Sequence, residues 1–505
     1  MTQRGLLRPG AHRFATFTDD DAVVRALVDV EIAWVRAQAA SGLIPAQHAD
    51  VVQQVLCGPL VDFTDVADLA IRAEAGGNPV IPMLHDVRAA VRAVDSEAAV
   101  SIHRGLTSQD VLDTALMVVA QRCVKAVRDE LMDCARALGK LATQHRDTPC
   151  VARTLTQHAV PATFGLRCAR WMHAVLDANQ ALANLRFPLA VGGAAGTLAG
   201  VDSLVESSAG MHPDGVADRT TVTALNSRWA AELGLNPPEH VWHTSREAVL
   251  QCGAALGQTA AALGAIANDV LLLSRPEIAE LREPVAPGRG VSSAMPQKQN
   301  PVLSVLIKRT ALSTPQLVAQ LFVAAGEFVD ERPDGAWHSE WPAFQDLLEL
   351  TGTATLQAGE LIAGLQIFPD AMRANLALSD PGLVSERLVR VLGPALTDHG
   401  LEAKAQIQEV LVTHAPSSRS GPGSDALTDG DGDGDGVWRE LLALTQGRTL
   451  PDGSAVTAEL IRELCDPAGY TGQAAQLVDD ALCRLEQVQA SSSAGKPASV
   501  REDQI

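Results

Sequence analysis

Hydrophobic residues recur at helical spacing over several long stretches of this chain. Four stretches are far longer than the average globular helix of roughly 11–12 residues: residues 110–145, 160–186, 246–275 and 302–327. The only prolines inside them are Pro161 and Pro315. Helices of such length are typical of bundles whose helices also pack against other subunits. The pattern predicts an all-α protein with a central bundle of long helices.

The third stretch is apolar on nearly every face. From Ala248 to Leu273 its only charged residue is Asp269. A helix that is apolar all round has to be buried all round. In a water-soluble protein this predicts that the helix contributes to a core shared between subunits.

Composition favours helix over sheet, and the charge excludes one class of partner. Alanine and leucine dominate and aromatic residues make up 3% of the chain, whereas sheets are enriched in aromatic and β-branched residues. The formal net charge is −20, whereas a surface that binds nucleic acid is basic. We therefore expect no nucleic-acid partner, but a local basic site for an anionic substrate is compatible with an acidic protein.

Cysteine spacing and the distribution of apolar residues indicate a soluble, cytoplasmic protein. The eight cysteines show no Cys-x-x-Cys pair and mostly lie in apolar helical contexts, as reduced core residues do. The first residues lack the apolar run of a signal peptide. A membrane span takes roughly 18 continuous, strongly apolar residues, and we expect none here, and therefore no membrane partner.

One segment is too polar and repetitive to pack a core. Residues 416–436 consist largely of Ser, Pro, Gly and Asp, which predicts a disordered insertion. A calcium-loop pattern also begins there, with matching residues at Asp429, Asp431, Asp433, Gly434 and Glu440. The unbranched Gly436 and the lack of a helix running into Asp429 favour disorder over calcium binding. A second flexible tail is predicted from Ser491 onward.

The most informative stretch for function is residues 290–301, Gly-Val-Ser-Ser-Ala-Met-Pro-Gln-Lys-Gln-Asn-Pro. It follows a loop rich in proline and glycine, and it brings together two hydroxyls, a cation and a carboxamide. Such groups are rarely buried without partners. They suit a site that holds a polyanionic substrate while a proton is removed from carbon.

Two further segments place polar groups at the start of a helix. Thr107 or Ser108 can cap the helix that follows, and Asp110 strengthens its first turn. The free amides of the same helix start can bind a substrate carboxylate. Arg246 opens a long helix and can pair with a carboxylate through two hydrogen bonds, or it can be an ordinary surface arginine.

Two other segments lie outside the helix starts. Gln157 and His158 stand at a junction between a loop and a helix, where polar groups can converge. A lone histidine is more often structural than catalytic. The glycines of residues 191–197 would let backbone amides approach a ligand or would simply make a tight turn.

The stretch at 290–301 resembles the signature of the fumarase/aspartase superfamily, Gly-Ser-Ser-x-Met-Pro-x-Lys-x-Asn-Pro. One position departs, because Val291 stands between Gly290 and Ser292. Over residues 12–480 the chain is most similar to the branch of 3-carboxy-cis,cis-muconate cycloisomerases, which includes nitrosuccinate lyases. The blocks that carry this likeness, besides the signature, are residues 77–82, 107–110, 157–161, 192–197 and 466–470.

The adenylosuccinate lyases of the same superfamily are less similar. They carry a histidine, usually assigned a role in proton transfer, where this chain has Leu155. The resemblance therefore leaves the proton donor to the leaving group unassigned at that position.

The resemblance implies a three-domain, all-α fold that assembles as a homotetramer with active sites shared between subunits. Residues 1–105 would form an N-terminal helical domain, and residues 106–370 would form the central bundle with a catalytic loop at 282–300. Residues 371–490 would form a C-terminal helical domain that carries the 416–436 insertion, followed by a flexible tail at 491–505. No metal and no organic cofactor is implied.

The resemblance also assigns roles to single residues. Ser292 matches the catalytic base, and Lys298 is a second catalytic residue, which with Asn300 holds the carboxylate on which negative charge builds. His158 is the candidate for assisting the leaving group. A serine is a poor base unless its pKa is lowered, which a helix N-terminus and Lys298 can do. The remaining predicted substrate-binding residues are Thr107, Ser108, Gln157, Arg246, Ser293 and Met295.

Members of the superfamily eliminate a group β to a carboxylate, or run the reverse addition. The chain is expected to convert a small dicarboxylate, such as nitrosuccinate, to fumarate through a carbanion. The alternative is cycloisomerisation of a tricarboxylate in aromatic catabolism. Ser245 and the insertion favour a specialised lyase. An adenylosuccinate lyase-like enzyme matches less well, and an inactive structural relative would be expected to lack Ser292, Lys298 or Asn300, all of which are present.

Overall fold

The computed structural model describes residues 5–209, 221–292, 294–295, 297–379, 382–396, 400–413 and 434–494. The chain divides into two compact units, each assembled from separate stretches of sequence. Unit 1 comprises Met1–Met132, Asp177–Ala267 and Leu303–Gly359, and unit 2 comprises Asp133–Leu176, Asn268–Val302 and Glu360–Ile505. The three-domain boundaries expected from the sequence stay a prediction.

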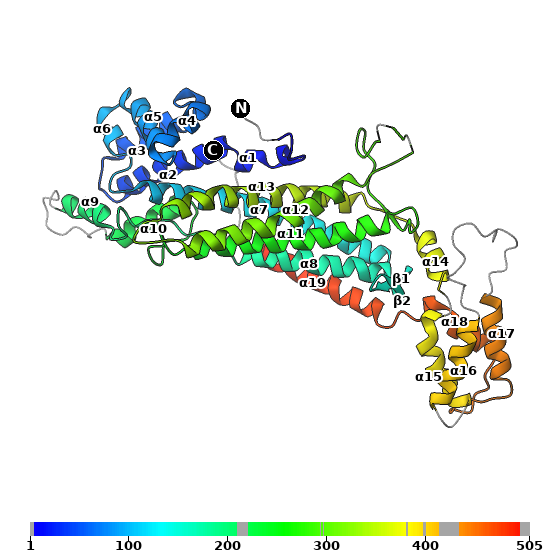
Figure 1. Ribbon diagram of the computed structural model, residues 1–505. Helices are drawn as coiled ribbons and strands as arrows, with labels where there is room; N and C mark the ends of the chain where they lie inside the picture. The colour runs from blue at the N-terminus through cyan, green and yellow to red at the C-terminus, as the bar shows by residue number, and fades with distance from the viewer. Residues whose placement is uncertain are drawn as a thin grey trace, which may run out of the picture. The chain divides into compact units, whose positions relative to one another are not determined.

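Long helices dominate the fold, as the sequence predicted (Figure 1). Three of them have nearly the predicted bounds: α7 (Ser108–Gln144), α11 (Glu247–Leu273) and α12 (Val302–Gly326). The sequence pattern did not indicate a further long helix, α13 (Gly335–Ala363). Pro315 and Pro342 lie inside α12 and α13. Each removes one helical hydrogen bond, so packing sustains these helices more than local propensity does.

The remaining helices of unit 1 are shorter, apart from α2. They are α1 (Ala15–Thr18), α2 (Asp20–Ala40), α3 (Ala46–Leu56), α4 (Val66–Gly76), α5 (Val80–Arg92), α6 (Ser96–Val100), α9 (Ala199–Ala209) and α10 (Val222–Glu232). Asp19, Asp65 and Asp95 cap α2, α4 and α6 through their side chains. A side-chain acceptor at this position satisfies amides that the helix leaves free.

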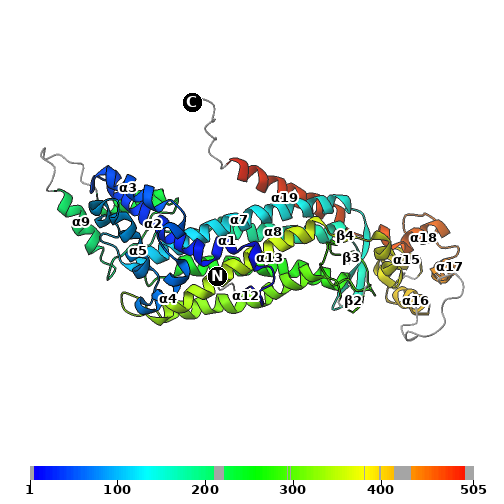
Figure 2. The same ribbon diagram turned by 90° about the horizontal axis from the view of Figure 1, so that it is seen from above.

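The loop between α6 and α7 is anchored to α2. In Figures 1 and 2, α3 and α5 lie against α2, the central helix of this part of unit 1. The buried Trp34 donates its indole N–H to the carbonyl of Arg104 at 3.1 Å, and Gln38 donates to the carbonyl of Ser101 at 3.0 Å. Buried donors of this kind fix the path of the loop that leads to Thr107 and Ser108.

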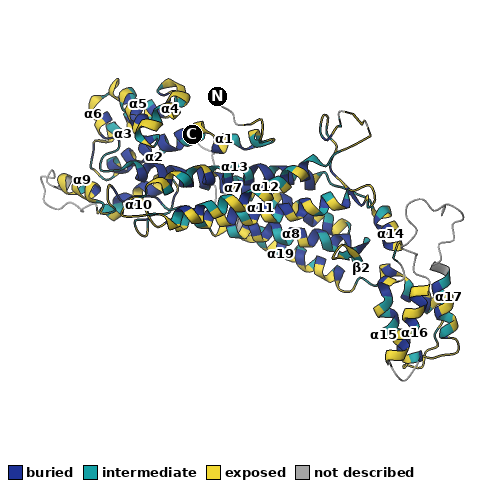
Figure 3. Ribbon diagram, viewed as in Figure 1, coloured by how far each residue is buried: buried dark blue, intermediate teal, exposed yellow. Residues whose placement is uncertain are grey.

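Helix α11 is not buried on every face within one chain. Along it one face is exposed and the rest is mainly buried (Figure 3). The exposed residues recur every three or four positions: Gln251, Ala254, Gln258, Ala261, Ala265, Asn268 and Leu272. No membrane span was expected, yet among the described helices α11 is the one long and apolar enough to cross a membrane by length and composition. Half of its most apolar window is buried inside the chain, as in a core helix.

Unit 2 contains a β-hairpin where the sequence pattern predicted the start of a helix. Strands β1 (Pro149–Thr154) and β2 (Gln157–Thr163) pair antiparallel, and α8 (Phe164–Ala183) begins only after them. The predicted helix over 160–186 was therefore wrong at its first residues. The apolar pattern of these residues runs on into that of α8, which is why the sequence predicted helix. In the structure their backbone groups instead form hydrogen bonds with β1. Thr163 then caps α8, since its hydroxyl accepts the N–H of Leu166 at 3.2 Å.

The turn of this hairpin is strained. Leu155 and Thr156 link the paired residues Thr154 and Gln157, and both have positive φ angles, 49° and 71°. Such a two-residue turn normally carries Asn-Gly. We expect the double substitution Leu155→Asn, Thr156→Gly to raise the free energy of unfolding by about 1 kcal/mol, because it relieves backbone strain.

Chemical denaturation of the wild type, the double variant and each single variant measures this effect. The two single changes should each contribute, with Thr156→Gly the larger, because a β-branched residue tolerates positive φ least. A double variant less stable than the wild type would contradict the strain assigned to the turn.

The rest of unit 2 includes a second small sheet and a C-terminal helical cluster. Strands β3 (Leu281–Arg282) and β4 (Gln366–Ile367) pair antiparallel, and α14 (Pro369–Ala377) packs against β1. The cluster has an apolar core and contains α15 (Ser385–Leu396), α16 (Gly400–Thr413), α17 (Gly434–Leu444) and α18 (Ala458–Cys465). The fold is thus mostly helical rather than purely α.

Two predicted flexible segments lie mainly outside the described residues. Residues 414–433 are not described, and with them fall Asp429, Asp431 and Asp433 of the calcium-loop pattern. Gly434 and Glu440 belong to α17, so the last residues of the predicted insertion are helical. Helix α19 (Ala474–Ala494) extends past Ser491, so the tail predicted from that residue begins later. None of the eight cysteines, all of which lie within the described residues, forms a disulfide, and most are buried, as expected.

Candidate active site

The N-terminus of α7 is held by Asp110. The backbone N–H of Thr107 donates to Oδ2 of Asp110 at 2.8 Å. The other carboxylate oxygen, Oδ1, accepts from the N–H groups of Gly192 and Gly193 at 2.8 and 3.2 Å, and it lies 2.8 Å from Nε2 of His243. The predicted stabilisation of the first turn by Asp110 is confirmed. The same carboxylate joins three separate segments of unit 1.

The glycine-rich segment makes a tight turn, and two of its backbone N–H groups donate hydrogen bonds to a side chain of the protein. A Cβ at Gly192 would meet Val241 at 2.7 Å and His243 at 2.8 Å, closer than such atoms approach. Gly193 has a φ of +69°, which favours glycine. Because Asp110 takes the amides of Gly192 and Gly193, the structure favours the tight turn over the alternative of a ligand-binding loop.

Arg246 is buried in an ion-pair cluster formed with two carboxylates of unit 1. Its guanidinium donates two hydrogen bonds to Asp113, at 2.7 and 3.0 Å, and two to Glu340, one of them at 3.0 Å. The Trp337 indole also donates to Asp113, at 2.9 Å. The side chain of Arg246 is fully buried. The guanidinium that the sequence assigned to a substrate carboxylate is instead bound by two carboxylates of the protein itself.

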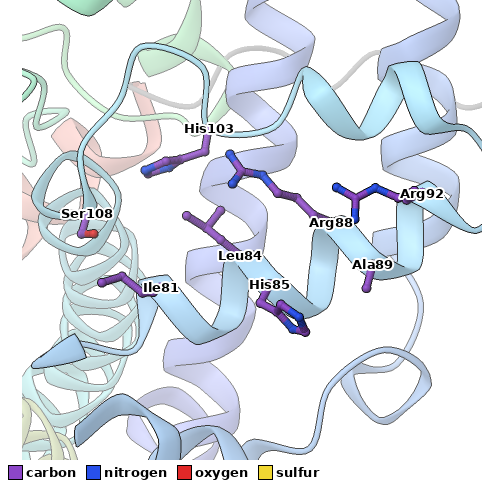
Figure 4. Close-up of a pocket in the computed structure, with 8 residues that line it drawn as sticks. All are labelled: Ile81, Leu84, His85, Arg88, Ala89, Arg92, His103 and Ser108. Atoms are coloured by element: carbon purple, nitrogen blue, oxygen red, sulfur yellow. The ribbon is translucent and has the colours of Figure 1, made fainter. Parts of the chain in front are cut away.

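Ser108 opens onto a cavity in unit 1. The cavity has a volume of about 480 Å³ and is lined by Ile81, Leu84, His85, Arg88, Ala89, Arg92, His103 and Ser108 (Figure 4). Figure 4 shows the side chain of Arg88 directed toward His103, and the ring of His103 directed toward Ser108. The lining contains guanidinium, imidazole and hydroxyl groups and no carboxylate, so it is suited to an anion.

His103 is locked in one orientation. Its Nδ1 lies 2.7 Å from Oε1 of the fully buried Glu31, and its backbone N–H donates to Oε2 of the same carboxylate at 2.9 Å. A carboxylate at Nδ1 places a proton on that nitrogen. The other ring nitrogen, Nε2, is then left to face the cavity.

The hairpin carries Gln157 and His158 in unit 2. Gln157 is exposed, and Nδ1 of His158 lies 2.8 Å from the hydroxyl oxygen of Ser379. Arg153 on β1 pairs with the buried Glu280 at 2.7 Å. Partial burial and the positive charge of Arg153 lower the pKa of His158 below its ordinary value, against an opposing effect of Glu280. The imidazole of His158 is therefore neutral at neutral pH.

The stretch at 290–300 folds back on itself. The backbone N–H of Asn300 donates to the carbonyl of Gly290 at 2.8 Å, and its side-chain amide donates to the same oxygen at 3.1 Å. Gly290 has a φ of +69°, and a Cβ there would lie 2.4 Å from the carbonyl oxygen of Asn300. Only glycine fits this closure, which explains the glycine that opens the motif.

Ser292 lies inside this closed loop. Its Oγ accepts hydrogen bonds from the backbone N–H groups of Met295 at 3.1 Å and Ala294 at 3.4 Å. Hydrogen bonds to the oxygen favour its anionic form. Lys298 is exposed and has no ion pair within the part of the chain that the structure describes. Ser293, also predicted to bind substrate, lies outside the described residues.

The predicted site residues fall into both units. Ser292, Met295, Lys298 and Asn300 share one loop of unit 2, which also contains the hairpin with Gln157 and His158. Thr107, Ser108 and Arg246 belong to unit 1. Thr107 directly precedes α7, and Ser108 is its first residue and borders the cavity. Arg246 is instead buried in the ion-pair cluster. Within the described ranges no group of three potential metal ligands occurs.

A protein-family model described as lyase matches residues 12–313. The chain belongs to the fumarase/aspartase superfamily of lyases. Its resemblance to the cycloisomerase-like branch of that superfamily is thereby confirmed.

Relatives within this superfamily cover nearly the whole chain. Nitrosuccinate lyase of Streptomyces davaonensis is 41% identical over 92% of this chain and 90% of its own length. The 3-carboxy-cis,cis-muconate cycloisomerase of Pseudomonas aeruginosa is 34% identical over 93% of both chains. The crystal structure of the 3-carboxy-cis,cis-muconate lactonizing enzyme of Pseudomonas putida matches with a TM-score of 0.79 and 27% identity, covering 95% of this chain and 98% of the other.

The sequence did not indicate three polar residues that line the cavity or form the ion-pair cluster. His103 stands four residues before the predicted Thr107, and its position near a helix start was the only signal. Arg88 lies inside the amphipathic pattern of α5, where an arginine is usually a solvated surface residue. Glu340 lies 94 residues from its partner Arg246, so no local pattern could reveal the pair.

Proposed function

We propose that this enzyme eliminates nitrite from nitrosuccinate and releases fumarate. The observation that carries the proposal is the 41% identity with a nitrosuccinate lyase over 92% of the chain. The identity with the cycloisomerase of Pseudomonas aeruginosa is lower, at 34% over a similar length. The relatives support a soluble enzyme, and its cytoplasmic location stays a prediction.

In the proposed reaction the anion of Ser292 removes a proton from the carbon next to one carboxylate. The electron pair of the C–H bond moves onto that carboxylate, where Lys298 and the Asn300 region stabilise the added charge. The pair then returns to form the C=C bond as the C–N bond breaks and its electrons leave with nitrite. The amides that donate to the Ser292 Oγ support the first step, because they stabilise the anion that acts as base.

The environment of His158 supports a leaving group that departs as an anion. Its lowered pKa makes the ring a poor source of a full proton at neutral pH. Leu155 supplies no proton donor at the tip of the hairpin either. Nitrite, the anion of an acid, needs no proton to depart, whereas an amine leaves readily only when protonated. A neutral His158 whose Nδ1 accepts from Ser379 keeps an Nε2–H with which to hold a nitro oxygen.

The alternative function is cycloisomerisation of 3-carboxy-cis,cis-muconate. The fold similarity to the lactonizing enzyme of Pseudomonas putida favours it. Opening of a muconolactone also expels an anion, a carboxylate, so the state of His158 does not separate the two reactions.

Purified enzyme assayed with each substrate decides between them. Incubation with nitrosuccinate is expected to give fumarate, followed in the ultraviolet, and an equal amount of nitrite. Aspartate serves as the control for amine elimination and should give no fumarate. Turnover of carboxymuconate without turnover of nitrosuccinate would refute the proposed function and support the alternative.

We also propose a homotetramer in which α11 packs against copies of itself. Its exposed residues recur at three and four, the spacing of a seam between helices. Three are alanines, Ala254, Ala261 and Ala265, which permit close approach of two helices. The expectation that this helix contributes to a shared core supports the same assembly.

Charge placed in this seam tests the assembly. Ala261→Arg is expected to dissociate the tetramer, because an unpaired guanidinium in a helix interface has no compensating partner. Sedimentation velocity measures the change, and Lys125→Ala, at an exposed position of α7, is the matched control. A variant A261R that remains tetrameric would show that α11 does not form the interface.

A further inference from the structure

Arg88 differs from Arg246 and Arg72, which are also partly or fully buried in unit 1 but form ion pairs. Arg246 is bound by two carboxylates, and Arg72 pairs with Asp68 and Asp86. Arg88 is half-buried, yet no carboxylate among the described residues pairs with it. Within the described ranges its guanidinium donates one hydrogen bond, from Nη2 to the carbonyl of Ile102 at 2.8 Å. The rest of its guanidinium is available to an external group.

The cavity that Arg88 faces is lined by basic, hydroxyl and apolar side chains. None of its eight lining residues is acidic, although the chain contains 60 acidic and 40 basic residues. The acidic residue nearest in sequence, Asp86, does not line the cavity: Arg72 and the hydroxyl of Thr64 both bind it at 2.6 Å, and its other oxygen lies 3.3 Å from Nδ1 of His85. A guanidinium in such surroundings pairs readily with a carboxylate brought by a ligand.

Arg88 is also fixed relative to the start of α7. The carbonyl it binds belongs to the residue before His103, whose ring Glu31 locks toward the cavity. His103 in turn is directed toward Ser108 (Figure 4). Arg88 of α5, His103 of the loop before α7 and Ser108 of α7 thus place a guanidinium, an imidazole and a hydroxyl around one cavity.

We propose that Arg88 binds a carboxylate of a dicarboxylate substrate in this cavity of unit 1. The inference rests on the proposed function for the identity of the substrate. A succinate derivative carries two carboxylates, and Arg246, which the sequence predicted to bind a substrate carboxylate, is already paired with Asp113 and Glu340. Arg88 supplies the missing cation, and Ser108 supplies a neutral donor beside it.

Direct binding of succinate, an unreactive dicarboxylate, tests this assignment by titration calorimetry. Arg88→Gln is expected to weaken succinate binding about 10- to 100-fold, since a charge-assisted hydrogen bond contributes roughly 1.5–3 kcal/mol. Arg88→Lys, which keeps the charge but loses the forked geometry, should recover part of the loss. The matched control is Arg25→Gln, because Arg25 also binds backbone carbonyls, of Leu56 and Gly58, but does not line the cavity.

Kinetics separate this proposal from the proposed function. If the enzyme does turn over nitrosuccinate, R88Q should raise KM far more than it lowers kcat. If it does not, weaker succinate binding in R88Q alone still supports the carboxylate site while the proposed function fails. Wild-type enzyme that binds no succinate, or R88Q that binds it as tightly as the wild type and R25Q do, would overturn the assignment of Arg88.

Discussion

Replacing Ser292 by alanine is expected to lower kcat by on the order of 10²–10⁴-fold, because it removes the proposed base. The backbone N–H groups of Ala294 and Met295 donate to the Ser292 oxygen. These hydrogen bonds stabilise the deprotonated, anionic side chain, which is the form that acts as a base. Alanine removes the oxygen and leaves both amides in place. KM should change little, since the lost interaction matters in the transition state rather than in the bound substrate.

Fumarate release, measured in the ultraviolet over a range of nitrosuccinate concentrations, gives both constants. Gln297→Ala is the matched control, because Gln297 is an exposed residue of the same loop and has no assigned role. Circular dichroism and sedimentation should show that both variants keep the fold and the assembly of the wild type. If S292A turned over nitrosuccinate about as fast as the wild type, Ser292 would not be the catalytic base.

Much of the fold could be predicted because its determinants are local. The bounds of α7, α11 and α12 were predicted closely, since an uninterrupted helical pattern and the lack of breaking residues both lie within the helix. The segment 160–163 was predicted wrongly because its state depends on pairing with 149–154. An apolar run that leads into a helix carries no sign of such a partner.

The same distinction applies to the candidate site. Ser292, Lys298 and Asn300 could be proposed because they lie within nine residues in one motif. The environment of Arg246 could not, because its partners Asp113 and Glu340 are 133 and 94 residues away. Arg88 left no signal, since what sets it apart is its place beside the cavity, which only the fold determines. A sequence reveals which charged groups exist, whereas the fold decides which of them remain available to a ligand.

Replacing Arg246 by methionine is expected to lower the free energy of unfolding by about 3–5 kcal/mol, because it leaves two buried carboxylates without their cation. Asp113 and Glu340 are both essentially inaccessible to solvent, and Arg246 is their shared ion-pair partner. Burial already raises the pKa of Glu340 despite the opposing effect of Arg246. Loss of Arg246 should raise that pKa further.

The raised pKa of Glu340 predicts how the defect of R246M depends on pH. A carboxyl group whose pKa is higher in the folded than in the unfolded protein costs no stability below the unfolded pKa. The cost grows as pH rises from the unfolded to the folded pKa and is complete above the folded pKa. The stability deficit of R246M should therefore be largest near neutral pH and should shrink as pH falls toward about 4.3, the ordinary pKa of glutamate. Urea denaturation at fixed protein concentration, at pH 5 and pH 7.5, measures the deficit. Arg136→Met, which breaks an exposed ion pair with Asp133, should cost under about 1 kcal/mol. A deficit for R246M no larger than that of R136M would show that the cluster around Arg246 does not support the fold.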